Sequence, residues 1–149
     1  MLPPMTDTFR ILASCAFVVF VLASCSDPVA IIHLDEEHAQ DLSGLRQAQV
    51  YEVERPSLLI VEAEAIIRKL NKQGIDIQAL NLIDPDMNDY RAYRNNNSTS
   101  FALDRVTLLP HKNSPPFPGF RSGNYVLMLG YSDNEDRFIA AYIATIHVR

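Results

Sequence analysis

Cysteine is nearly absent from this chain. Its 149 residues include two cysteines, Cys15 and Cys25, and no cysteine follows Cys25. A segment without thiols forms no disulfide, holds no metal through thiolates and has no cysteine nucleophile. We therefore expect residues 29–149, which suffice for one substantial core, to form a single globular domain stabilised by apolar packing alone.

Glycine is scarce as well, with five in the whole sequence. Their positions form neither a GxGxxG motif nor a phosphate-binding P-loop. Gly119 and Gly123 enclose Ser122, but this serine stands one place too late for the GxSxG nucleophile elbow. Since no set of residues predicts catalysis, we expect neither an enzyme nor a cofactor.

Positive charge is also in deficit. The chain has 13 Lys and Arg residues against 18 Asp and Glu residues, and its net charge is −5 at pH 7. Nucleic-acid binding depends on the neutralisation of phosphates by Lys and Arg side chains. We therefore expect no nucleic-acid partner.

The long apolar run of the sequence lies near its start. Residues 11–24 follow Arg10 and contain no charge. The run is shorter than the roughly 18 residues of a membrane-crossing helix and fits the roughly 7–15 apolar residues of a signal peptide. Its end, Leu22-Ala23-Ser24-Cys25, resembles the lipobox of bacterial lipoproteins. The resemblance implies that residues 1–24 are removed, that Cys25 carries acyl chains such as palmitate, and that residues 25–28 form a short tether.

A second copy of the quartet ends at Cys15. Cleavage there would leave almost no apolar segment in front, so Cys25 is the expected lipid acceptor; Met5 is a second candidate start. A retained signal anchor and a plain secreted protein are the alternatives. Each buried methylene adds about 0.8 kcal/mol, so two or three chains make a durable anchor. Ser26, not an aspartate, follows the cysteine, which favours the periplasmic face of the outer membrane.

The apolar pattern beyond the tether is mainly that of strands. A 3.6-residue period predicts one amphipathic helix over residues 57–73, with Pro56 before it and Gly74 after it. Residues 84–100 and 110–124 show no period and are expected to be loops. The predicted strands are residues 29–34, 47–54, 75–83, 101–109, 125–131 and 137–148, of which the last two form a hairpin.

These elements predict a mainly β fold, an antiparallel two-sheet sandwich with one inserted amphipathic helix. The alternative is an α+β fold, a single antiparallel sheet with the helix packed on one face. The place of residues 101–109, in a facing sheet or beside the carboxyl-terminal hairpin, distinguishes the two.

Two acidic segments resemble metal sites in part. Asp84, Asp86 and Asn88 match the first half of a calcium loop, but the glycine and the glutamate that complete such a loop are missing. His33 and His38 flank three acids, yet side chains five residues apart lie about 140° apart on a helix. We therefore expect turns or loops here and no metal.

Two loop segments mix aromatic and arginine side chains, which are enriched where interfaces concentrate their binding energy. The first contains Tyr90, Arg91 and Tyr93, and the second contains Phe117 and Phe120. These five residues are candidate partner contacts. The alternative is that the aromatics cover the ends of the sheet.

The order of segments in residues 25–149 carries a resemblance to a known family. The segments are Val50-Tyr51-Glu52-Val53, Leu108-Leu109-Pro110, Asn124-Tyr125-Val126, Gly130-Tyr131-Ser132-Asp133 and Phe138-Ile139-Ala140-Ala141. Together they resemble TssJ, the outer-membrane lipoprotein of type VI secretion systems. The resemblance implies a two-sheet sandwich that binds the periplasmic part of the inner-membrane protein TssM.

In that family the first inter-strand loop makes most of the contact, and residues 35–46 match it here. The resemblance therefore makes Asp35, Glu36 and Glu37 candidate partner contacts. The expected function is that of a structural component of an envelope-spanning machine. The alternative is a periplasmic binding module or inhibitor that uses its aromatic and arginine loops.

Overall fold

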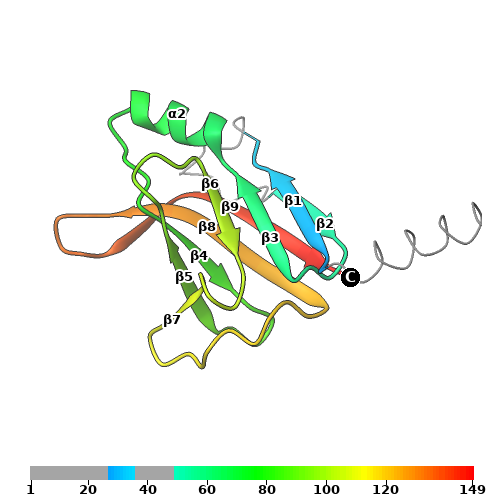
Figure 1. The fold of residues 1–149 in the computed structure, drawn as a ribbon. Helices are drawn as coiled ribbons and strands as arrows, with labels where there is room; N and C mark the ends of the chain where they lie inside the picture. The colour runs from blue at the N-terminus through cyan, green and yellow to red at the C-terminus, as the bar shows by residue number, and fades with distance from the viewer. Residues whose placement is uncertain (1–26, 36–48) are drawn as a thin grey trace, which may run out of the picture.

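Two β-sheets and one short helix make up the described part of the chain, which comprises residues 27–35 and 49–149 of a computed structural model (Figure 1). One sheet has three strands in the order β1-β3-β6, and the other has six in the order β2-β9-β8-β4-β5-β7. The elements are β1 (Val29–His33), β2 (Gln49–Val53), β3 (Leu58–Glu62), α2 (Glu64–Lys72), β4 (Ala79–Ile83), β5 (Asp89–Tyr93), β6 (Ser100–Leu103), β7 (Leu109–His111), β8 (Gly123–Ser132) and β9 (Phe138–Val148).

Strand β6 decides between the two predicted architectures. It pairs with β3 in the small sheet, whereas the hairpin of β8 and β9 belongs to the large sheet. The two sheets face each other, so the predicted mainly β two-sheet sandwich is confirmed and the single-sheet alternative is wrong. The predicted strand at residues 101–109 is in fact two strands, β6 and β7, one in each sheet. The Asp104 carboxylate breaks it by accepting the N–H groups of Val106 at 2.8 Å and Thr107 at 2.9 Å, which closes a tight turn.

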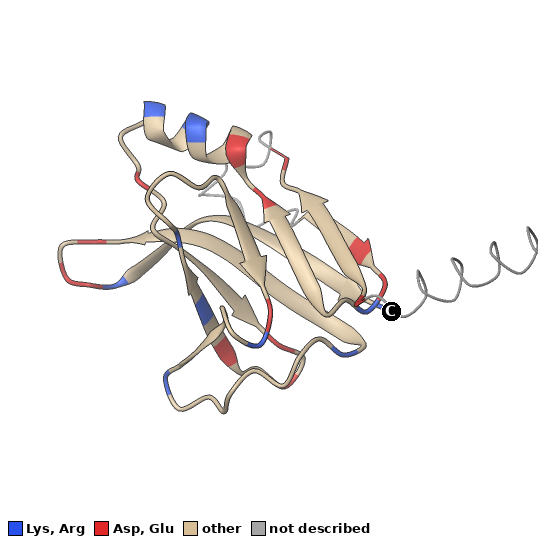
Figure 2. Ribbon diagram, in the orientation of Figure 1, with Lys and Arg blue, Asp and Glu red and all other residues tan. Residues whose placement is uncertain are grey.

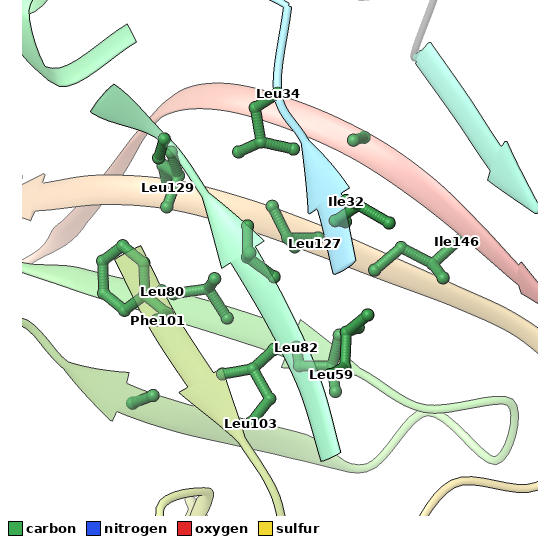
Figure 3. Packing of buried hydrophobic residues seen from close by; sticks show 14 of the residues in the cluster. Ile32, Leu34, Leu59, Leu80, Leu82, Phe101, Leu103, Leu127, Leu129 and Ile146 are labelled. Carbon is green, nitrogen blue, oxygen red and sulfur yellow. The ribbon is translucent and has the colours of Figure 1, made fainter. Parts of the chain in front are cut away.

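The core lies between the facing sheets. Side chains alternate along a strand, so every second residue of each inner strand points toward the opposite sheet. Figure 3 shows these side chains meeting from both sheets. Burial of one such aliphatic side chain contributes about 1.5–3 kcal/mol. The inward residues include Ile32, Leu59 and Leu103 from the small sheet and Leu80, Leu82, Leu127 and Ile146 from the large one, and all are 4% exposed or less.

Two strand pairs are parallel, so the predicted antiparallel pairing is wrong for these two pairs. β1 pairs with β3, and β2 pairs with β9, in parallel registers, while the other pairs are antiparallel. Parallel neighbours need a crossover connection. Here β2, which lies in the large sheet, is part of the connection between β1 and β3 of the small sheet. The chain therefore passes from one sheet to the other and back before β3 begins.

The predicted helix at residues 57–73 is wrong in its first third. That part forms β3, in which Leu59 and Val61 are fully buried while Leu58 and Ile60 are half-buried on the other face. The run of β-branched and leucine residues satisfies both the strand period and the helix period, and pairing with β1 on one edge and β6 on the other favours the strand. Within residues 57–73 only α2 is helical. It ends at Lys72, one residue earlier than predicted, and Gly74, the predicted terminator, follows with a φ of 78° that favours glycine.

The predicted loop at residues 84–100 contains β5, which pairs with both β4 and β7. Tyr90 and Ala92 point into the core, while the polar Asp89 and Arg91 lie on the outer face of the sheet. This alternation is typical of a strand that is covered on one face. It was not predicted from the sequence because both of those outer residues are charged. The third outer residue, Tyr93, is exposed.

The predicted carboxyl-terminal hairpin is confirmed as β8 and β9, the longest strand pair of the structure. The turn between them is closed by the Asp133 carboxylate, which accepts the N–H groups of Glu135 and Arg137, both at 2.9 Å. The inner face of the pair is buried and the outer face is half-exposed. The other predicted strands differ in their ends by a few residues: 75–83 begins at Ala79, and 47–54 spans Gln49–Val53.

Candidate membrane anchor and partner surface

The predicted lipidation site, Cys25, lies outside the described residues, but the start of the folded body is well defined. The Pro28 carbonyl accepts hydrogen bonds from the N–H groups of Ser57 at 2.8 Å and Leu58 at 3.4 Å. Pro28 is therefore already fixed to the start of β3, one residue before β1 begins. The part of the predicted tether that is free of the domain can include at most residues 25–27.

The first residue of the predicted partner loop, Asp35, is held by a pair of tyrosines. The Asp35 N–H donates to the Tyr51 hydroxyl at 3.2 Å, and that hydroxyl lies 3.3 Å from the hydroxyl of Tyr142. Burial and the hydrogen bond with Tyr51 raise the pKa of Tyr142 well above its ordinary value, so this hydroxyl stays neutral. The pair ties Asp35 to β2 and β9 of the large sheet. The other two candidate acids, Glu36 and Glu37, lie outside the described residues.

Three of the aromatic candidates are not on the surface. Tyr90 is fully buried, Phe117 is 4% exposed and Phe120 is 7% exposed. With Tyr125 they form a chain of edge-on and tilted rings whose centroids lie 5.0, 5.1 and 5.4 Å apart. Such contacts stabilise a core. These three side chains therefore belong to the hydrophobic core, and little of their surface is open to a partner.

Arg91 and Tyr93 do lie on the outer face of β5, beside the edge strand β7. The Arg91 Nε donates to the Asn81 Oδ1 at 2.8 Å, its Nη2 lies 3.4 Å from the His111 Nε2, and its guanidinium stacks 5.0 Å above the centre of the Phe138 ring. Tyr93 is 64% exposed. Arg91 is thus held flat on the sheet as a fixed cation, next to an exposed aromatic ring.

The polar groups that hold Arg91 were not predicted from the sequence. Asn81 is 3% exposed, and its Nδ2 donates to the Asp89 Oδ1 at 3.4 Å. The Asp89 carboxylate in turn lies 3.9 Å from the Lys112 Nζ. The available signal was Asn81 itself, an amide within an otherwise apolar strand, because a buried amide needs hydrogen-bonding partners. The outer face of β4, β5 and β7 therefore carries a connected polar cluster.

The segment that resembled half a calcium loop is a turn, as expected. The Asp84 Oδ1 accepts the N–H groups of Asp86 at 2.9 Å and Asn88 at 2.8 Å, and its Oδ2 accepts the Asn88 side-chain amide at 3.1 Å. Arg121 forms an ion pair with Asp86. The carboxylate oxygens thus hold the β4–β5 turn. Within residues 27–35 and 49–149 no group of three His, Cys, Asp or Glu side chains is arranged to hold a metal ion.

The fold and these surfaces define a class, a two-sheet β-sandwich with a buried aromatic chain and a polar cluster on the outer face of the large sheet. No helix among the described residues is long and apolar enough to span a membrane. Comparisons of the chain with protein-family models, with curated proteins and with solved structures find no match.

Proposed function

We propose that the chain is a lipoprotein held by Cys25 at the periplasmic face of the outer membrane, where it acts as a structural component of an envelope-spanning machine. The observation that carries the proposal is the attachment of Pro28 to β3, three residues after the lipobox cysteine. A chain of three residues spans at most about 11 Å. Lipid on Cys25 would therefore hold the sandwich directly at the bilayer surface.

We propose further that the machine is of the type VI secretion kind and that the partner is a TssM-like inner-membrane protein. The two-sheet sandwich agrees with the TssJ resemblance. The segment that begins at Asp35 leads from the small sheet to the large one, and Asp35 is held by its hydrogen bond to Tyr51. A loop with a fixed start loses less conformational freedom on binding, which favours affinity.

Intact-mass measurement of the protein purified from the envelope tests the anchor. We expect the mass of a chain that begins at Cys25 and carries two or three acyl chains. Cys25→Ser should abolish both the acylation and the cleavage, whereas Cys15→Ser should change neither, because Cys15 lies in the part removed. An intact Met1 or an unmodified Cys25 thiol in the wild-type protein would overturn the anchor.

Co-purification with the inner-membrane partner tests the loop. Charge reversal at Asp35, Glu36 and Glu37 to Lys should reduce recovery of the partner. The matched control reverses three exposed acids elsewhere, Glu54, Glu64 and Glu135, whose side chains are 78%, 55% and 70% exposed. Both variants change the net charge by the same amount. Equal recovery from the loop variant and the control, with the fold intact, would contradict the assigned loop.

A periplasmic binding module remains the second candidate, and the exposure of Tyr93 beside the fixed guanidinium of Arg91 favours it. An aromatic ring next to an arginine suits a planar or anionic ligand. Isothermal titration of the protein with envelope fractions should then show saturable heat that Tyr93→Ala removes. The absence of any saturable heat would contradict this candidate.

A further inference from the structure

A groove of about 390 Å³ opens at the end of the sandwich where β1 and β3 begin and β6 ends. Four segments form it: Pro28 before β1, the residues before β3, the turn after β6 and the loop before β8. Figure 1 places the carboxyl terminus at this same end. We call it the arginine groove. Its lining includes Pro28, Arg55, Ser57, Arg105, Gly119 and Phe120.

The two guanidinium groups of the arginine groove have no acidic partner within the described part of the chain. The Arg55 Nη2 donates to the neutral Ser122 Oγ at 3.1 Å. Arg105 lies against Gly119, where an added Cβ would be 3.1 Å from its Nε. Most other described arginines behave differently, because each forms an ion pair with a carboxylate. Those five are Arg68, Arg94, Arg121, Arg137 and Arg149.

The one carboxylate that lines the groove, Asp104, is engaged within its own turn. It accepts the N–H groups of Thr107 and Val106 and the Thr107 hydroxyl. The Thr107 N–H contributes most to lowering the pKa of Asp104, so this group stays ionised. Two arginines and one aspartate leave the lining with a net charge of +1. The same turn fixes the backbone of Arg105, which projects into the groove beside Gly119.

The position of the groove relative to Cys25 indicates which anion can bind there. Pro28 lines it and stands three residues after Cys25, and three residues span at most about 11 Å. If Cys25 carries lipid, the groove lies at the level of the phospholipid headgroups. Guanidinium groups bind phosphate oxygens in pairs of parallel hydrogen bonds. An unpaired arginine in that layer therefore has a phosphate within reach.

We propose that the arginine groove binds the phosphate of an anionic phospholipid headgroup in the bilayer to which the chain is anchored. The proposal rests on the proposed anchoring through Cys25. Binding there orients the sandwich: this end meets the bilayer, and the opposite end, with α2 and the β8–β9 turn, points away from it (Figure 1). Figure 2 shows basic residues of the described chain at the anchored end, where β3 begins and β6 ends, with acidic residues beside them.

The test uses the mature protein purified from the envelope and placed in nanodiscs of phosphatidylcholine with or without phosphatidylglycerol. A photocrosslinking residue replaces Val106, which lines the groove and is 82% exposed. We expect a phospholipid adduct by mass spectrometry, in higher yield when phosphatidylglycerol is present. A basic residue near an anionic bilayer contributes about fivefold to association. The double variant Arg55→Gln and Arg105→Gln should therefore lower the adduct yield by up to about 25-fold.

The matched control is Arg68→Gln with Arg137→Gln, two exposed arginines that lie far from the groove. Its adduct yield should equal that of the unsubstituted protein. A second test variant, Ser57→Glu, places a carboxylate in the groove without removing an arginine and should also lower the yield. Circular dichroism at the same concentration checks that each variant is folded.

Two results would overturn phospholipid binding by the arginine groove. One is an adduct yield that stays the same in the arginine variant and in Ser57→Glu, and the other is an equal yield in nanodiscs without phosphatidylglycerol. Inorganic phosphate serves as the competitor for the free anion. If it abolishes the adduct at millimolar concentration, the groove takes free phosphate and the lipid assignment is wrong. The intact mass of the same sample reports on Cys25, so a failure of the anchor is recognised separately from a failure of the groove.

Discussion

The Tyr90 hydroxyl leads to the sharpest prediction about stability. Tyr90 is fully buried, and its hydroxyl has no hydrogen-bonding partner among residues 27–35 and 49–149. A buried polar group without a partner costs about 1–3 kcal/mol of stability, because it gives up its hydrogen bonds to water. Tyr90→Phe removes the hydroxyl and keeps the ring, which retains its edge-on contact with Phe117. We expect the free energy of unfolding to rise by about 1–2 kcal/mol.

The measurement is urea denaturation followed by tyrosine fluorescence and far-ultraviolet circular dichroism, since the chain has no tryptophan. A gain of about 1–2 kcal/mol should raise the urea midpoint with an unchanged slope, because the surface exposed on unfolding stays the same. The thermal midpoint should rise by about 4 °C for each kcal/mol.

Tyr125 is the matched control, a fully buried tyrosine in the same chain of aromatic rings. Its hydroxyl accepts the Arg121 N–H at 2.9 Å and donates to the Arg121 carbonyl at 3.3 Å. Tyr125→Phe should therefore lower stability by about 1–2 kcal/mol. A destabilised Tyr90→Phe variant, or equal changes for the two variants, would refute the reasoning by showing that the Tyr90 hydroxyl is hydrogen-bonded.

Three further predictions concern the core and the dependence of stability on pH. Leu127→Ala, at a fully buried position of β8, should lower the free energy of unfolding by about 2–5 kcal/mol in urea denaturation; a loss below about 1 kcal/mol would contradict the placement of β8. Gly130→Ala puts a Cβ 2.3 Å from the Ile139 carbonyl oxygen, so a loss of about 1–3 kcal/mol is expected in the same assay, and an unchanged midpoint would count against this close approach. The pKa of Tyr142 is raised in the folded state, so the stability that its neutral hydroxyl contributes is complete below about pH 10 and is lost as the pH rises, because the unfolded chain releases the proton first. Tyr142→Phe should therefore reduce the fall in the free energy of unfolding above pH 10. Parallel curves of stability against pH for the two proteins would disprove the raised pKa.

The sequence predicts an element correctly where the residues that determine the element lie close together along the chain. The hairpin of β8 and β9 is predicted correctly because two apolar segments flank a short polar turn, and each strand is the other's neighbour. The end of α2 just before Gly74 is equally local. By contrast, residues 58–62 fit both a helix and a strand, and only the presence of β1 and β6 on either side selects the strand.

The candidate partner contacts show the same division. The aromatic and arginine residues of two segments were predicted to be partner contacts, but their composition does not say which side of a sheet they face. Register with β4 places Tyr90 on the inner face and Arg91 on the outer one. A shift of one residue would exchange them. The pairing of distant strands therefore decided which candidates a partner can reach.

The amino-acid sequence by itself determined the mainly β composition, the closing hairpin and a domain whose described part has no cysteine. Each of these follows from residue types and from spacing within one segment. Only the tertiary structure decided the two parallel pairings, the strand within the predicted helix and the strand within the predicted loop. It also decided the burial of the aromatic chain and the meeting of Arg55 with Arg105 at the Pro28 end. The physical reason is that a strand pairs and packs with residues that lie far away along the chain. Its own residue pattern therefore does not show which strands will be its neighbours or which of its faces will be buried.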